Sequence, residues 1–204
     1  MAKVKLTKNE LKKKKDALKM YRRYLPTLQL KKQQLQVEIR AVEARHAQLM
    51  AAKSAIEVAS KQWIAVFSEE SAARNLHGKP YLRVESIDTS SGNIAGVVIP
   101  VYEGTVFAVD DYDLYLVPLW VDKALETLKS ILELDAEASI VARQRELLSR
   151  ELRVTTQRVN LFEKVKIPET VEDIKRIGIY LGDQQTAQVV RGKIAKRKVE
   201  EVGQ

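Results

Sequence analysis

Between residues 11 and 67, apolar side chains return every three and four positions, which is the spacing of a helix packed along one stripe. Two interleaved sets repeat every seven residues. The first set is Leu11, Leu18, Leu25, Lys32, Ile39, His46, Lys53, Ser60 and Phe67. The second set is Lys14, Tyr21, Leu28, Leu35, Val42, Leu49, Ile56 and Trp63. We predict one continuous helix about 85 Å long at 1.5 Å per residue, and its stripe needs a partner of similar length.

A second heptad pattern begins at Ala124 and supplies this partner. Its two sets are Ala124, Ile131, Ala138, Arg145, Leu152, Val159 and Thr127, Leu134, Val141, Leu148, Thr155, Phe162. The phase slips near Pro168, where we expect a kink, and resumes as a stutter would produce, at Ile167, Val171, Ile174, Gly178 and Leu181. We therefore predict a mainly α fold in which the N- and C-terminal segments form a long antiparallel two-helix coiled coil. A parallel homodimer through the first helix is the alternative arrangement.

The predicted coiled-coil seam consists of Leu18, Leu25, Leu28, Leu35, Ile39, Val42, Leu49, Ile56, Trp63, Ile131, Leu134, Val141, Leu148, Leu152, Val159 and Phe162. Polar residues interrupt it, notably Lys53 and Arg145, which favours shallow packing over a tight zipper. Thr7 is the expected N-cap, with Glu10 three positions later as in a capping box. Pro26 should bend the first helix without ending it, and the glycine and proline of residues 75–80 should end it.

Between the two helices the period changes to two, which is typical of strands. We predict a short β-hairpin with strands over residues 81–88 and 94–101, joined by turn residues 89–93. The hairpin is expected to project from the tip of the rod. Because a two-stranded hairpin is marginal alone, it must pack on the helices or on another protein. The apolar residues up to Trp120 should then dock on Trp63, Val66 and Phe67. The predicted organisation is an N-terminal helix over 1–76, a central region over 77–116 and a C-terminal helix over 117–204.

The net charge of +8 is unevenly distributed along the chain. Residues 1–32 carry a net charge of +10, whereas residues 84–122 contain seven carboxylates and no lysine or arginine. An antiparallel hairpin would gather the basic termini at one end and the acidic middle at the other. Like charges gathered in this way predict an acidic partner for the basic end.

Candidate chemistry is scarce. The chain has no cysteine, and its two histidines, His46 and His77, stand in unrelated settings without clustered carboxylates. Gly192-Lys193 lacks the remaining residues of a phosphate-binding loop. We therefore expect no catalytic residue, no cofactor and no metal, and a protein that acts by contact. No apolar run approaches the 18 residues of a membrane span, and no signal peptide is visible, so a soluble or peripheral protein is expected.

Three stretches resemble the D subunit of the V-type and A-type rotary ATPases. The first is Leu6-Thr7-Lys8-x-x-Leu11 before the lysine-rich helix. The second is the segment from Asn93 through Gly96 and Pro100 to Glu103, and the third runs from Arg158 and Asn160 to Ile167-Pro168. The resemblance covers essentially the whole chain. Departures occur at Leu25-Pro26-Thr27, at Leu161-Phe162 and beyond Leu181.

This resemblance implies a non-catalytic central rotor shaft. It would transmit torque between a head of alternating A and B subunits and an ion-translocating membrane ring. It implies further contacts with the F subunit along the coiled coil and with the C subunit towards the ring, on the cytoplasmic face of the membrane and without membrane insertion. We expect the basic end to contact the head through Lys12, Lys13, Lys14, Lys15, Arg22, Arg23, Arg191 and Lys193.

Two other functions fit part of the pattern. The basic N-terminal segment is compatible with a coiled coil that binds nucleic acid, although the acidic middle and the lack of aromatic residues among the basic ones argue against it. A structural tether would explain the two helices. It would not explain the three motif stretches.

Overall fold

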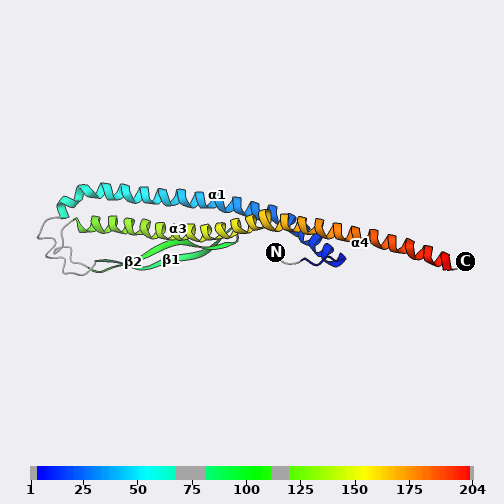
Figure 1. Cartoon of the computed structure of the whole chain (residues 1–204). Coiled ribbons are helices and arrows are strands. Elements are labelled where there is room, and N and C mark those ends of the chain that lie inside the picture. Colours follow the sequence, from blue (N-terminus) through cyan, green and yellow to red (C-terminus); the bar gives the residue numbers. More distant parts are fainter. Residues whose placement is uncertain (1–3, 68–80, 112–119, 203–204) are drawn as a thin grey trace. The chain divides into compact units, whose positions relative to one another are not determined.

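The computed structural model describes residues 4–67, 81–111 and 120–202. Its elements are α1 (Lys8–Phe67), β1 (Leu82–Ile94), β2 (Val97–Val109), α3 (Val121–Leu161), the π-helix η1 (Phe162–Lys166) and α4 (Ile167–Val202) (Figure 1). Long helices at both ends and an antiparallel hairpin between them confirm the predicted fold class.

Helix α1 begins and continues as its local sequence predicts. The Glu10 backbone N–H donates to the Thr7 hydroxyl oxygen at 3.3 Å, which confirms Thr7 as the N-cap. Pro26 lies inside α1 without ending it, although its ring nitrogen cannot donate to the carbonyl four residues back. Next to it, the Thr27 hydroxyl donates to the Tyr24 carbonyl at 2.8 Å. The predicted end near residues 75–80 lies outside the described residues.

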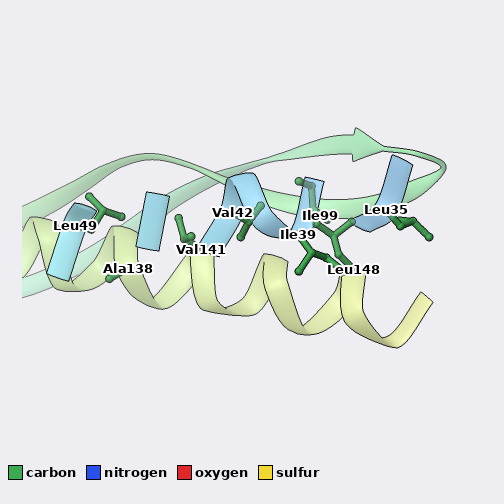
Figure 2. Packing of buried hydrophobic residues seen from close by; sticks show 8 residues of the cluster. All are labelled: Leu35, Ile39, Val42, Leu49, Ile99, Ala138, Val141 and Leu148. Atoms are coloured by element: carbon green, nitrogen blue, oxygen red, sulfur yellow. The ribbon is translucent and has the colours of Figure 1, made fainter. Parts of the chain in front are cut away.

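The chain divides into two compact units, residues 33–153 and residues 1–32 with 154–204, and each is described separately. In the 33–153 unit, α1 and α3 run antiparallel. Arg45 pairs with Glu137 and Lys53 with Asp135, both at 2.7 Å, so the partner number falls as the α1 number rises. Between these helices lies a core of eight buried residues (Figure 2). They are Leu35, Ile39, Val42, Leu49, Ile99, Ala138, Val141 and Leu148.

The hairpin turn differs from the predicted one. Strands β1 and β2 pair continuously from Ile94↔Val97 through Gly92↔Ile99, and the turn is Ala95–Gly96. Both turn residues have positive φ, 51° and 80°, and the Asn93 side-chain oxygen accepts the Gly96 N–H at 2.9 Å. The predicted turn over 89–93 was wrong, because these residues belong to β1 and Gly92 pairs with Ile99. A Cβ there would lie 2.8 Å from the Val101 side chain, so the glycine permits close cross-strand packing.

The hairpin also lies elsewhere than predicted. It runs along α3 instead of projecting from the tip of the helix pair (Figure 1). The Ile99 side chain is 3% exposed within the α1–α3 core, and the Gln144 side-chain amide donates to the Pro100 carbonyl at 2.6 Å. Burying Ile99 against both helices supplies the packing that a two-stranded ribbon lacks by itself.

In the other unit, the start of α1 pairs with α4 and the end of α3, again antiparallel. The Tyr21 and Phe162 rings lie 5.2 Å apart, and the Lys14 ammonium is 2.8 Å from the Asp173 carboxylate. The buried residues of this unit are Thr155, Val159, Thr170 and Ile177.

The π-helix η1 accounts for the phase slip near Pro168. The Ile167 N–H donates to the Phe162 carbonyl five residues back, so the helix holds one extra residue here. Consequently Thr170 is buried eight positions after Phe162, and Ile177 seven positions later. The predicted continuation was wrong at Val171 and Gly178, which are exposed, while Ile167, Ile174 and Leu181 are half-buried.

Candidate interaction surfaces

Most predicted seam residues have little exposure. Leu35, Ile39, Val42, Leu49, Val141, Leu148 and Val159 are at most 9% exposed. Leu18, Leu25, Leu28, Ile56, Ile131, Leu134, Leu152 and Phe162 are half-buried. The structure describes the backbone but not the side chains of residues 62–67, so the Trp63 side chain and the predicted contacts of Val66 and Phe67 are not described.

Polar residues at seam positions reach partners or solvent. Lys53 pairs with Asp135, and the Ser60 hydroxyl donates to the Ile56 carbonyl at 2.7 Å. Arg145 was expected in the seam but is exposed, which is consistent with the cost of burying a guanidinium group without a partner. The packing is therefore shallow at Lys53 and Arg145.

Several buried residues were not among the predicted seam residues. Thr155 occupies a heptad position, although threonine is more often exposed than buried. Thr170 and Ile177 follow a phase that becomes visible only once the π-helix is known. Ile99 is a β-prone residue whose burial depends on helices distant in the sequence.

The two units differ strongly in charge. Residues 1–32 and 154–204 contain 22 Lys/Arg against 9 Asp/Glu, a net charge of +13. Residues 33–153 contain 13 against 18, a net charge of −5. A cationic unit and an anionic unit therefore occur within one chain, and each favours partners of the opposite charge.

All but one of the predicted basic contact residues are exposed. Lys12, Lys13, Lys15, Arg22, Arg23, Arg191 and Lys193 lie at the surface of α1 or α4. Lys14 differs, because its side chain is 28% exposed and donates to Asp173. This hydrogen bond raises the pKa of Lys14 above 10.5 against the opposing effect of desolvation, and nearby carboxylates add to the rise. Lys14 is thus already engaged in an ion pair within its own unit.

The motif positions fall into two groups. Asn93, Gly96 and Pro100 form and dock the hairpin turn, through the Asn93–Gly96 bond, the positive φ of Gly96 and the Pro100 carbonyl. Arg158, Asn160 and Pro168 are exposed around η1. The first group therefore has a local structural role in the hairpin.

Residues 4–67, 81–111 and 120–202 contain no cluster of three His, Cys, Asp or Glu residues that could hold a metal ion. An apolar groove of about 510 Å³ lies between α1 and α3, lined by Ile56, Trp120 and Ile131 among others. Its single titratable lining residue, Lys123, pairs with Glu126 at 2.9 Å. Within the same described part of the chain, no helix is long and apolar enough to cross a membrane.

Paired long helices, a hairpin docked on them and exposed charged faces are typical of a protein that binds other macromolecules through its surfaces. The chain belongs to the family of ATP synthase D subunits, whose model matches residues 10–197.

Relatives from several bacteria are similar to this chain over almost its whole length. The V-type ATP synthase D subunit of Borreliella burgdorferi is 49% identical over 196 residues, which cover 96% of this chain and 95% of the relative. The V-type ATP synthase D subunits of Chlamydia pneumoniae and Chlamydia caviae are 34% and 32% identical, each covering 97% of this chain and 93% and 94% of their own length.

Proposed function

We propose that this chain is a non-catalytic component of a V/A-type ATPase and forms the central shaft that transmits torque between the A/B head and the membrane ring. Family membership supports a place in such a complex. The observation that carries the shaft role is the charge separation between the cationic unit, at +13, and the anionic unit, at −5.

The proposed head contact is the cationic unit. Exposed lysines and arginines on α1 and α4 would meet acidic side chains of the A and B subunits. Long, solvated cations attract without demanding one fixed geometry, which suits a surface that must turn past successive partners. Because Lys14 is held by Asp173, the free cations of its cluster are Lys12, Lys13 and Lys15.

The remaining proposed contacts follow from the family. The F subunit would lie against the paired helices, and the C subunit would join the shaft to the membrane ring. The complex would lie on the cytoplasmic face of the membrane, with this chain peripheral to it. No contact with nucleic acid is proposed, and a gel shift at physiological ionic strength would reveal one.

Reconstitution with the A and B subunits tests the shaft role. The chain has no native cysteine, so Val98→Cys, at a position 66% exposed in β2, supplies a unique attachment point for a bead. We expect one copy per A/B hexamer and stepwise rotation of the bead during ATP hydrolysis. A monodisperse chain that does not associate with A and B would contradict the proposal.

Charge variants test the head contact separately. Replacing Lys12, Lys13 and Lys15 with Gln should weaken binding to the A/B hexamer and reduce its salt dependence, because fewer cations then face the head. The matched control replaces Lys61, Lys123 and Arg153, three exposed cations of the anionic unit, with Gln. Equal effects of the two triple variants would contradict a specific role of the cationic unit.

A further inference from the structure

The strand register assigns each hairpin residue to one of two faces. The Ile99 face contacts the helices, since Ile99 is buried in their core. Side chains alternate along each strand, and a bulge shifts this alternation by one residue. The register shows two bulges: Glu85 is the extra residue of β1, and Glu103 is the extra residue of β2.

At the open end of the hairpin, the face opposite Ile99 is apolar. It carries Leu82, Val84, Ile87, Phe107 and Val109, which we call the outer apolar face. Leu82 pairs with Val109, and Val84 pairs with Phe107. Val84, Ile87 and Val109 are 43%, 45% and 42% exposed. Further along the same face, the Tyr102 hydroxyl lies 2.9 Å from the Thr105 hydroxyl across the second bulge, which supports the assignment.

In β1 this alternation is the reverse of the one expected for a strand whose sole partner is the helix pair. A sheet with one covered face normally turns its apolar residues inward and its polar residues outward. In β1, the Ile99 face instead continues with Arg83, Ser86, Asp88 and Ser90, all of them exposed. In β2 the same face carries Val101, Val106 and Ala108, whereas the apolar residues of β1 in this half, Leu82, Val84 and Ile87, lie on the outer apolar face. The pattern therefore indicates a second partner on the outer apolar face.

Charge and width indicate the kind of partner. Residues 82–111 contain five carboxylates and one basic residue, Arg83, which already pairs with Asp110 at 3.1 Å. Of the five, Glu85 and Glu103 stand at the two bulges, whereas Asp88 lies on the Ile99 face. The excess of carboxylates around the hairpin repels phosphate groups and anionic lipid headgroups, and it attracts lysine and arginine. Two strands about 4.8 Å apart present an apolar strip about 10 Å wide, which matches the diameter of one α-helix.

We propose that the outer apolar face binds one amphipathic helix of another polypeptide, whose apolar stripe is bordered by lysine and arginine. Leu82, Val84, Ile87, Phe107 and Val109 would receive the stripe. The carboxylates of Glu85 and Glu103, at the two bulges, would face the basic border. This inference goes beyond the shaft role and does not depend on it, since it concerns the hairpin and not the cationic unit.

Photo-crosslinking in cells that contain the full chain in its native assembly tests the proposal. A benzophenone amino acid replaces Ile87 on the outer apolar face, and in a matched control it replaces Ser90, which is exposed on the opposite face. Crosslinked peptides are then identified by mass spectrometry. We expect adducts from position 87, and not from position 90, with a segment of another polypeptide that has a helical apolar period and flanking Lys or Arg.

A second variant tests the charge border. Glu85→Lys with Glu103→Lys should lower the yield of that adduct by about tenfold, because two attractive surface pairs become repulsive. Circular dichroism establishes that each variant is folded. The proposal is overturned if position 87 crosslinks only within its own chain, to a second copy of the hairpin or to an acidic segment. Equal yields from positions 87 and 90, or no adduct from either position, would also overturn it.

Discussion

Removing one residue from the π-helix should preserve the packing of the 1–32/154–204 unit. Phe162 contacts Tyr21, and Thr170 is buried eight positions later, whereas a regular helix returns to the same face after seven. Deleting Val165, which is 47% exposed, restores the seven-residue step. Pro168 must change to alanine as well. In a regular helix interior its ring would meet the carbonyl four residues back, at a cost of about 3 kcal/mol.

The matched control deletes Glu172, an exposed residue between Thr170 and Ile177. No extra residue is present there, so everything beyond it turns by about 100° around the helix axis. Ile177 is 0% exposed and would leave the seam, which costs about 1.5–3 kcal/mol for burial of its side chain. For the variant that combines deletion of Val165 with Pro168→Ala, we expect a free energy of unfolding within about 1 kcal/mol of the wild-type value, since α-helical hydrogen bonds replace π-helical ones. Deletion of Val165 alone should cost about 3 kcal/mol.

Urea unfolding followed by circular dichroism gives these free energies, provided that the slope with denaturant is unchanged. Tryptophan fluorescence does not report on this unit, because Trp63 and Trp120 both belong to residues 33–153. Hydrogen exchange over residues 155–177 supplies the local measurement. Equal destabilisation by the double variant and by deletion of Glu172 would refute the assignment of the phase slip to the π-helix.

Three further changes test the core, the hairpin and the Lys14–Asp173 ion pair. Leu148→Ala removes a side chain that is 0% exposed, and urea unfolding should show a loss of about 2–5 kcal/mol. Gly92→Val should lower the free energy of unfolding by about 1–3 kcal/mol, because the new side chain overlaps the opposite strand, and hydrogen exchange in the hairpin should rise. Gly104→Ala should have neither effect, since nothing lies within 4 Å of a Cβ added there. Lys14→Met tests the ion pair by pH. Because the Asp173 bond raises the pKa of Lys14, its stabilisation is complete below pH 10.5 and is lost as pH rises through the higher folded-state pKa. The wild type should therefore lose more stability than Lys14→Met above pH 10.5, and parallel alkaline unfolding curves would contradict the pairing.

The helices were predictable because their signals are local and repeated. Thr7 with Glu10 marks a helix start whatever lies around it, and the heptads that contain Leu35 and Leu148 repeat often enough to outweigh individual charged positions. Fold class and an interruption near Pro168 followed directly. The form of the interruption did not, because a proline is compatible with a kink, a stutter or a π-turn. Only the burial of Thr170 and Ile177 distinguishes them.

The hairpin shows where local information ends. Residues 89–93 have strong turn chemistry, yet Gly92 is needed opposite Ile99 so that the strands can approach, and the chain turns at Ala95–Gly96. The same holds for the charge cluster at the start of α1. Composition does not show that Lys14, unlike the neighbouring lysines, forms an ion pair, because its partner Asp173 is 159 residues away in the sequence.

Helix length, seam composition, strand tendency and uneven charge are therefore properties of the amino-acid order alone, since each depends on neighbours within a few turns or a few residues. The docking of Ile99 on two helices, the eight-residue step across η1 and the Lys14–Asp173 pair depend on the folded contacts. The physical reason is that burial and ion pairing are set by whichever distant side chain arrives within a few ångströms, and no local period encodes that partner.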